Sequence, residues 1–165
     1  MAEKEKLLEL KNVVYSFHTY GGEVKAVRDV SFEVRKGEIL GIVGESGCGK
    51  SVTAQCIMRL NPEPPGFFEG GEILFNGKDV LKMDKKELRQ LRGGDIGFVF
   101  QDPMTSLNPT MRVGAQIEEV FIGRAGVSKK EVKEKALEIM KLVGISDVEK
   151  RYRQYPHELS GGMKQ

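Results

Sequence analysis

The chain has 165 residues, the size of a single domain, and its composition of 39% hydrophobic and 30% charged residues excludes a chain that is disordered throughout. The 26 basic and 24 acidic residues leave a net charge of +2, which gives no reason to expect nucleic acid as a partner. No apolar run approaches the roughly 18 residues of a membrane-spanning helix, and the charged N-terminus lacks the apolar region of a signal peptide, so we expect a cytosolic protein.

The N-terminal part of the chain predicts an antiparallel pair of strands. Residues 7–17 alternate loosely between apolar and polar, and residues 24–34 place most of their apolar side chains on one face. Residues 19–22 between them suit a turn. After a second turn at Lys36 and Gly37, the short apolar run 38–43 is typical of a buried strand.

A glycine-rich loop follows this predicted strand and fits the pattern G-x-x-x-x-G-K-[ST], the P-loop or Walker A motif. Residues 52–60 after it can form a helix. In this context the loop can wrap around a phosphate, because its N–H groups and the positive end of the helix dipole face an anion. Lys50 can reach the β- and γ-phosphates of a nucleotide, and the Ser51 hydroxyl can bind Mg²⁺. The predicted binding residues are Gly44, Glu45, Ser46, Gly47, Cys48, Gly49, Lys50, Ser51 and Val52.

The two cysteines, Cys48 in the loop and Cys56 in the predicted helix, are expected to remain free. A disulfide between them would distort the loop, and cytosolic thiols are kept reduced. No histidine lies near them, so a metal site is not expected. We interpret Cys48 as a small residue in a tight loop and Cys56 as a buried helix residue.

The middle of the chain predicts further short elements. Residues 61–66 contain three prolines and a glycine that break regular structure, and residues 71–77 are typical of a strand and a turn. Residues 83–91 predict a short helix in which Asp84 caps the N-terminus ahead of Glu87. Residues 95–100 are typical of another buried strand, which ends at Gln101.

From Asp102 onward the pattern becomes helical. Residues 102–110 form a turn-rich connector, and residues 113–122 have apolar side chains at helical spacing. Ser128 and Glu131 form a capping box for a helix that Gly144 can end. We therefore predict two parts, a β-rich core over residues 1–101 and a helical subdomain over residues 102–165.

A second glycine-rich stretch, residues 159–163, lies near the C-terminal end and could form another anion nest at the start of a helix. Such a Ser-Gly-Gly sequence alone is usually a loop. It becomes informative beside the P-loop and the glutamine that ends the predicted strand between them.

These three motifs resemble the nucleotide-binding subunit of ABC transporters over the whole chain, with Walker A at residues 44–51, the Q-loop at Gln101 and the signature at residues 159–163. Residues 41–47, 100–109 and 155–160 are similar to the peptide-importer branch, with nickel importers close by. The resemblance implies an α/β fold of the ABC-type P-loop NTPase class, with an N-terminal antiparallel β subdomain and an inserted helical subdomain. It implies ATP and Mg²⁺ as cofactors.

The resemblance also assigns roles to individual residues. Phe17 would stack on adenine, with Tyr20 and Tyr15 as alternatives, or else would simply fill the strand face. Lys50 and Gln101 would be the catalytic residues, and Ser51 and Gln101 would contact Mg²⁺. Ser160, Gly161 and Gly162 would bind the γ-phosphate of ATP held by the second ATP-binding subunit of a head-to-tail dimer.

Two features depart from the family pattern. Val52 stands where many relatives have threonine, and the sequence stops at Gln165, before the Walker B strand, the D-loop and the switch histidine. We therefore expect the C-terminal part of the core to be missing. The chain would then be a fragment, or half of a split polypeptide whose remainder binds alongside. Without a water-orienting carboxylate, we expect it to bind nucleotide weakly and to turn it over very slowly.

The leading interpretation is the ATPase subunit of a peptide importer, peripheral on the inner face of the cell membrane. It would dock on the transmembrane permease subunits through the helical subdomain and the connector between Gln101 and Asn108. A nickel importer, a peptide exporter and a non-hydrolysing nucleotide-binding module remain alternatives. A soluble ABC-type ATPase acting on nucleic acid or ribosomes is disfavoured by the near-neutral charge and the lack of a coiled-coil insertion.

Overall fold

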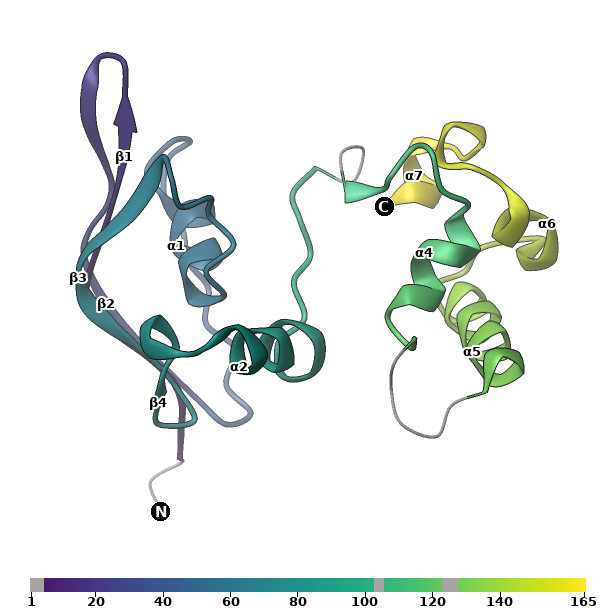
Figure 1. The fold of residues 1–165 in the computed structure, drawn as a ribbon, viewed down its shortest axis with the longest axis horizontal. Coiled ribbons are helices and arrows are strands. Elements are labelled where there is room, and N and C mark those ends of the chain that lie inside the picture. Colours follow the sequence, from purple (N-terminus) through teal and green to yellow (C-terminus); the bar gives the residue numbers. More distant parts are fainter. Residues whose placement is uncertain (1–4, 103–105, 123–127) are drawn as a thin grey trace. The chain divides into compact units, whose positions relative to one another are not determined.

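The computed structural model describes residues 5–102, 106–122 and 128–165. The chain divides into two compact units, residues 1–97 and residues 98–165 (Figure 1). The first unit is built on a β-sheet and the second is helical. No helix among the described residues is both long enough and apolar enough to span a membrane.

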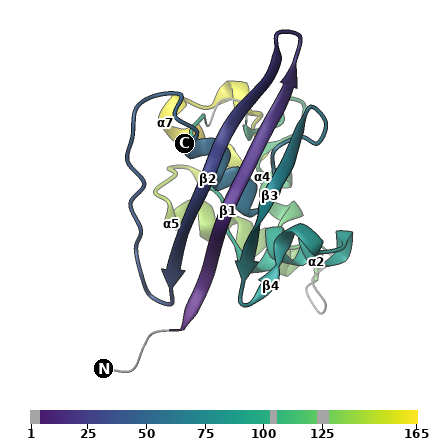
Figure 2. The same ribbon diagram turned by 90° about the vertical axis from the view of Figure 1, so that its left-hand side faces the viewer.

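The sheet of the first unit has four antiparallel strands in the order β2-β1-β3-β4 (Figure 2). These strands are β1 (Lys6–Thr19), β2 (Gly22–Arg35), β3 (Gly66–Phe75) and β4 (Lys78–Asp79). The strands predicted at residues 7–17, 24–34 and 71–77 are therefore confirmed, as is the turn between the first two. The structure extends β3 back to Gly66, into the segment whose prolines and glycines predicted irregular backbone.

Three neighbouring strands depart from regular pairing at one level of this sheet. The β1–β2 register shifts between Leu10 and Val13, where Asn12 has a left-handed φ of 49°. The Asn12 amide donates to Asp29 of β2 over 2.8 Å, and Asp29 also has a positive φ, of 54°. A Cβ on Gly71 of β3 would lie 2.5 Å from the Asn12 carbonyl oxygen. Bulges of this kind bend a strand and increase its twist.

Helices cover one face of the sheet (Figures 1 and 2). The helical segments of the first unit that position the site are α1 (Lys50–Ile57), η1 (Val80–Lys82), α2 (Lys85–Gln90) and the π-helical turn η2 (Leu91–Asp95). Cys56 of α1, Val80 of η1 and Leu91 of η2 are all buried in one core with the inward side chains of the sheet. These sheet residues are Leu10, Val13, Tyr15, Val27, Ile73 and Phe75.

The short helix α2 starts as its sequence predicts. The Asp84 carboxylate accepts from the N–H groups of Lys86 and Glu87, each over 2.8 Å, and the Glu87 carboxylate accepts from the Asp84 N–H over 3.1 Å. This is a complete capping box, in which two otherwise unpaired backbone donors are satisfied reciprocally.

The predictions of buried strands at residues 38–43 and 95–100 are wrong. Residues 38–43 and 96–100 have no regular secondary structure, and Asp95 belongs to the π-helical turn. Ile39, Val43 and Val99 are exposed by 97%, 95% and 93%. The physical reason is the lack of a neighbour, because a strand is hydrogen-bonded and covered only beside another strand. None of the strands in the described ranges pairs with either segment.

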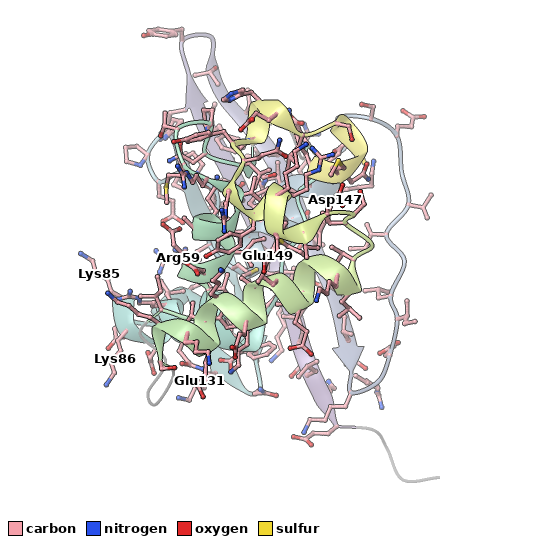
Figure 3. The ribbon with its side chains drawn as sticks, turned by 90° about the vertical axis from the view of Figure 1, so that its right-hand side faces the viewer. Arg59, Lys85, Lys86, Glu131, Asp147 and Glu149 are labelled. Carbon is pink, nitrogen blue, oxygen red and sulfur yellow. The ribbon has the colours of Figure 1, made fainter. Side chains whose placement is uncertain are left out.

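The second unit contains α4 (Val113–Glu119), α5 (Lys129–Leu142), α6 (Val148–Arg153), η3 (Pro156–Glu158) and α7 (Gly161–Lys164). The capping box of Ser128 and Glu131 at the start of α5 is confirmed, and Glu131 lies in the first turn of that helix (Figure 3). At its end Gly144 has a φ of +80°, and Ile145 N–H donates to the Met140 carbonyl over 3.0 Å. This pattern is the Schellman motif, so the predicted glycine stop is confirmed.

The core of this unit is small, and the partly buried Tyr152 packs against it. A Cβ on Gly114 would lie 2.3 Å from the Tyr152 ring, so only glycine allows α4 to approach α6 this closely. The Tyr152 hydroxyl donates to the Glu118 carboxylate over 2.5 Å. The pKa of Tyr152 is raised to about 12, mainly because the hydroxyl is buried and to a smaller extent because it bonds to Glu118. The fully apolar part of this core is Val113, Met140, Val148 and Leu159.

Candidate nucleotide-binding site

The Walker A loop requires glycine at two positions in this structure. Gly47 and Gly49 have φ values of +81° and +93°, in the left-handed region that side chains disfavour. A Cβ on Gly49 would also lie 2.2 Å from the carbonyl oxygen of Ala26 on β2. Gly49 therefore serves both the turn of the loop and its close approach to the sheet.

The Lys50 side chain folds back over this loop. Its ammonium donates to the carbonyl oxygens of Gly44 and Glu45, over 2.7 and 2.5 Å, and lies 3.5 Å from the Cys48 sulfur. The lysine thus holds the two ends of the loop together and places a positive charge beside its backbone.

The loop and the first turn of α1 present unpaired donors. The first intrahelical bond of this region is from Thr53 N–H to the Gly49 carbonyl, over 2.8 Å. The N–H groups of Lys50, Ser51 and Val52 have no acceptor within the described part of the chain, as expected for the start of a helix. The first turn of α1 has no acidic residue that would neutralise the positive end of its dipole.

These features fit a nucleotide phosphate, because an anion can accept from the loop and helix donors and can pair with Lys50. They fit Mg²⁺ only as a companion of the phosphates. The Ser51 hydroxyl is a single oxygen ligand, and no group of three or more His, Cys, Asp or Glu side chains among the described residues could hold a metal ion. Mg²⁺ typically completes its shell with phosphate oxygens and water.

The helix that carries these donors is anchored from its buried side. The Asn61 side chain, which is 6% exposed, donates to the Val52 carbonyl over 3.1 Å and to the Cys56 sulfur over 3.2 Å. Burial raises the pKa of the Cys56 thiol to about 12. Sequence reasoning treated Asn61 only as a helix breaker, because its buried contacts with α1 are not visible in the local pattern.

Both cysteines are free, as predicted, with Cys48 exposed and Cys56 buried. The interpretation of Cys56 as a buried helix residue is therefore confirmed. Cys48 lies in the tight turn of the loop, where its sulfur would be 2.8 Å from a Cβ on Gly44.

The three aromatic residues considered for adenine stacking have different surroundings. Tyr15 is fully buried, where its ring packs edge-to-face against Phe17 and Phe68 at centroid distances of 5.3 and 4.7 Å. Burial raises the pKa of Tyr15 to about 12. Phe17 is half-buried and Tyr20 is exposed at the hairpin turn. Tyr15 therefore belongs to the core, Phe17 packs against that core while it stays partly exposed, and Tyr20 is open to solvent.

The other predicted site residues lie in the second unit. Gln101 is exposed and lies outside regular secondary structure. Ser160 caps α7 by accepting from Met163 N–H over 3.4 Å, and Leu159 before it is buried. Gly161 and Gly162 are exposed, and a Cβ on either would meet nothing within 4 Å. The fold of this unit by itself therefore does not require glycine at these two positions.

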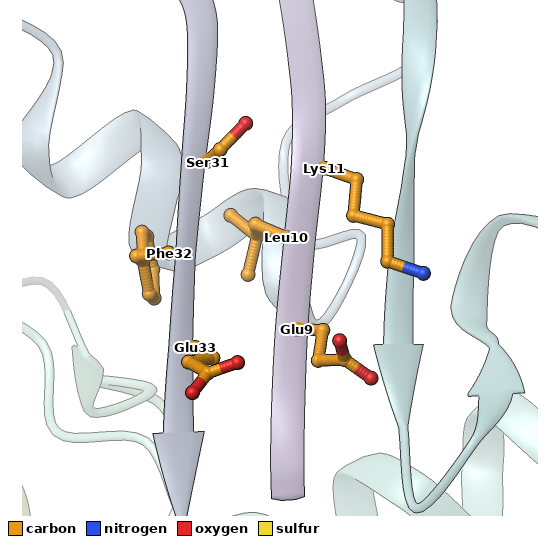
Figure 4. Close-up of a pocket in the computed structure, with 6 residues that line it drawn as sticks. All are labelled: Glu9, Leu10, Lys11, Ser31, Phe32 and Glu33. Carbon is orange, nitrogen blue, oxygen red and sulfur yellow. The ribbon is translucent and has the colours of Figure 1, made fainter.

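One surface depression is explained by the chain's own charges. It encloses about 260 Å³ on the sheet and is lined by Glu9, Leu10, Lys11, Ser31, Phe32 and Glu33 (Figure 4). Lys6 lies 2.9 Å from Glu9 and 2.8 Å from Glu33, and Arg35 lies 2.7 Å from Glu33. Hydrogen bonds from Lys6, and to a smaller extent from Arg35, lower the pKa of Glu33. Because these carboxylates are already compensated, the depression offers little to a ligand.

Comparison with known proteins identifies the family. The profile of the ABC transporter family matches residues 27–165, which include the Walker A loop, Gln101 and the signature stretch. The chain belongs to the ABC transporter family. Its β-sheet with covering helices and its helical unit are those of the ABC-type P-loop NTPase fold.

Curated relatives of this ABC protein are peptide transport proteins. The oligopeptide transport ATP-binding protein OppD of Bacillus subtilis is 57% identical over all of this chain and 46% of the relative. The dipeptide transport ATP-binding protein DppD of the same organism is 52% identical, over 98% of this chain and 48% of the relative. The chain thus spans about half the length of these relatives.

Solved ABC structures resemble the chain closely. A dimeric structure of the ATP-binding cassette MJ0796, in a post-hydrolysis state with ADP and Pi, has a TM-score of 0.81 and 28% identity. The similarity covers 96% of this chain and 65% of that one. A second dimeric structure of MJ0796 matches with the same values.

Proposed function

We propose that this chain is the ATP-binding part of a peptide importer, in which ATP binding and hydrolysis drive uptake through transmembrane permease subunits. The observation that carries the proposal is the Walker A loop, where Lys50 closes the loop and the N–H groups of Lys50, Ser51 and Val52 are unpaired. The similarity to OppD and DppD supports peptides as the cargo.

In this proposal each loop residue binds a different part of the phosphate chain or its metal ion. Lys50 exchanges its bonds to the Gly44 and Glu45 carbonyls for the β- and γ-phosphate oxygens. The N–H groups at the start of α1 hold the phosphate chain, and the Ser51 hydroxyl would be a ligand of Mg²⁺. Bound Mg²⁺ would neutralise negative charge on the phosphates.

Hydrolysis itself is largely a matter of positioning and charge stabilisation. A water oxygen bonds to the γ-phosphorus while the bond to the bridging oxygen breaks. That oxygen leaves with the electron pair on ADP, and the proton of the water passes to an oxygen of the released phosphate or to solvent. Gln101 is proposed to orient this water and to contact Mg²⁺. Lys50, Ser51 and Gln101 supply no carboxylate that could orient the water. We therefore propose that the 165-residue chain alone binds nucleotide but turns it over very slowly.

The signature stretch is proposed to serve a second ATP-binding subunit. Ser160, Gly161 and Gly162 are exposed beside the buried Leu159, and the two glycines are not demanded by the packing of their own unit. A ligand or backbone from outside the unit can approach glycines closely. Together with the dimers observed for MJ0796, this supports a head-to-tail pair in which each ATP lies between Walker A and the partner's signature.

The permease subunits are proposed to dock on the helical unit. A groove of about 410 Å³ there has a mainly apolar lining. The amide of Gln116 fixes its edge, because it donates to the Asn108 and Met111 carbonyls and accepts from Asn108 N–H. The lining residues are Ser106, Leu107, Gln116, Ile117, Glu119, Val120, Phe121 and Ile139. Residues 103–105 of the predicted docking connector lie outside the described residues. Such docking would hold the protein on the inner face of the membrane.

The decisive test is nucleotide binding. We expect a fluorescent ATP analogue with Mg²⁺ to bind the chain, and the Lys50→Ala variant to lose at least roughly tenfold in affinity because charge-assisted bonds to phosphate are lost. Lys85→Ala is the matched control, since Lys85 is an exposed lysine that points outward at the start of α2 (Figure 3). Equal affinity of the two variants would contradict the proposed site.

A further inference from the structure

One arginine holds the C-terminal end of the Walker A helix. The Arg92 Nε donates to the Met58 carbonyl over 2.8 Å, and a second guanidinium nitrogen donates to the Arg59 carbonyl. Met58 is the C-terminal cap of α1 and Arg59 follows it with a left-handed φ of 49°. The contact therefore joins the end of α1 to a segment more than thirty residues further along the chain.

The chemistry of this contact suits a helix end. The last carbonyls of a helix have no partner within it and carry the negative end of its dipole. A guanidinium offers a permanent charge and several donors in a fixed plane, so it can bind two carbonyls at once, which a lysine cannot do with the same geometry. No basic residue in the last turn of α1 itself supplies this charge.

Such a tether matters because α1 is short. Its eight residues are fewer than the number at which isolated helices become stable in water, so its orientation depends on tertiary contacts. Its buried side is held by the core through Cys56 and by Asn61. Arg92 is the contact that adds a charge-assisted bond at the end opposite the phosphate donors.

The position of Arg92 depends on the π-helical turn η2. Ile96 N–H donates to the Leu91 carbonyl over 2.9 Å, one residue further back than in an α-helix. Leu91 is 1% exposed and lies in the core of the first unit, so the turn is fixed there. Turns of this kind often occur at functional sites. The same stretch of chain continues to Gln101.

We propose that Arg92 is a positioning residue for nucleotide binding, a role that rests on the proposed function of the Walker A loop. By fixing the C-terminal end of α1, it sets the angle at which Lys50, Ser51 and Val52 present their N–H groups to the phosphates. Because it binds the end of α1 opposite the phosphate donors, it would not itself contact the nucleotide or the metal. Nothing in the local sequence around Arg92 signals this role, because its two acceptors are distant in the chain.

The test compares three variants of the full chain. Arg92→Gln removes the charge and the forked geometry, and Arg92→Lys restores the charge alone. Arg89→Gln is the matched control, since Arg89 is an exposed arginine on α2 that loses the same charge. Affinity for the fluorescent ATP analogue and hydrogen exchange of the α1 amides are measured well below the unfolding temperature.

We expect Arg92→Gln to weaken nucleotide affinity by roughly three- to tenfold, as for a lost hydrogen bond to a charged group, with Arg92→Lys in between. Exchange should accelerate in α1 and remain unchanged in β1 and β2, which a general loss of stability would not produce. Arg89→Gln should behave as the unchanged chain. Unaltered affinity and exchange in Arg92→Gln would overturn the proposal.

Two further results are informative. If the unchanged chain does not bind the analogue, the proposed function fails, and the exchange of α1 in Arg92→Gln alone decides whether Arg92 holds the helix. If Arg92→Gln does not fold, Arg92→Lys decides. An Arg92→Lys chain that folds and matches the unchanged chain in affinity and exchange would refute the need for the guanidinium fork.

Discussion

The strands of the antiparallel sheet and the two apolar segments 38–43 and 96–100 have similar sequences but opposite surroundings. Tyr15 and Ile73 in the sheet are fully buried, whereas Ile39 and Val99 are exposed by 97% and 93%. β1 has a hydrogen-bonded neighbour on each side, and none of the strands in the described ranges pairs with the two segments. Apolar, β-branched sequence gives a tendency to form a strand, but only a neighbouring strand makes it one.

The same difference in burial separates the two segments that flank the Walker A loop. The segment that enters the loop, residues 38–43, is exposed and irregular, whereas the helix that leaves it packs in the core. The loop is therefore held by α1 and by its own Lys50, and Gly49 lies close to the Ala26 carbonyl of β2. Substitutions on the two sides should consequently have very different effects.

The largest contrast is expected between two isoleucines. Ile73→Ala should lower the free energy of unfolding by about 2–5 kcal/mol, because it leaves a cavity in the core of the sheet. Ile39→Ala should change it by less than about 0.5 kcal/mol, because the side chain is already in solvent. Urea denaturation of both variants measures the difference. Similar losses would mean that residues 38–43 are buried in solution.

A smaller contrast is expected within the loop. Gly49→Ala combines a positive φ with a Cβ placed 2.2 Å from the Ala26 carbonyl oxygen, whereas Gly47→Ala has the positive φ and open space. We expect Gly47→Ala to cost about 1–2 kcal/mol of unfolding free energy, from the left-handed conformation alone. Gly49→Ala should cost more and should also weaken nucleotide binding. Thermal unfolding and titration with the ATP analogue measure both effects, and a reversed order would refute the close approach of the loop to β2.

The caps of the helices should show a local effect of about 1 kcal/mol. Ser128→Ala removes the acceptor for Glu131 N–H at the start of α5, and such losses typically cost about 0.5–2 kcal/mol. Ser128→Asp is the matched control, because aspartate is an equally good cap. Hydrogen exchange at the start of α5 should rise in the first variant only. A rise in both would show that the hydroxyl itself, and not capping, is required.

A difference in reactivity, with little change in stability, is expected between the two cysteine thiols. Cys48 is exposed and should react with a thiol reagent at neutral pH, whereas Cys56 is buried and its pKa is raised to about 12. Bound nucleotide should slow the reaction of Cys48, because the phosphates would occupy the loop. Mass spectrometry of the labelled chain identifies which cysteine reacts. Preferential labelling of Cys56 would contradict the packing of α1.

The same shift gives a pH dependence. The unfolded thiol has a pKa near 9.0 and the folded Cys56 thiol about 12, so the unfolded state loses its proton first. The contribution to stability is complete below pH 9 and decreases as the pH rises toward 12. Cys56→Ala should reduce this alkaline loss, leaving the parts due to Tyr15 and Tyr152, whose pKa values are each raised from 10.0 to about 12. Equal pH profiles of stability for the unchanged chain and Cys56→Ala would refute the raised pKa of the Cys56 thiol.

Local patterns were sufficient for the elements whose bonds are local. The capping boxes at Asp84 and Ser128 and the glycine stop at Gly144 were predictable, because each depends on residues within a few positions of one another. The antiparallel strands β1 and β2 were predictable because a tight turn joins them. The Walker A motif likewise predicted where a loop with positive φ glycines would precede a helix.

The remaining features depend on contacts between distant residues. Burial of residues 38–43 and 96–100 depends on a strand partner, which a run of apolar residues does not reveal. The close approach of Gly49 to Ala26, the anchoring of α1 by Asn61 and the grip of Arg92 on its C-terminal end also join segments far apart in the chain.

The sequence by itself thus predicted the phosphate loop and determined the short capped helices and the family, because these reside in contiguous residues. Only the tertiary structure decided which apolar segments are covered and how the Walker A helix is held at its two ends. The physical reason is that backbone pairing and burial are properties of neighbours in space, whereas capping, turn formation and loop chemistry are properties of neighbours in the chain.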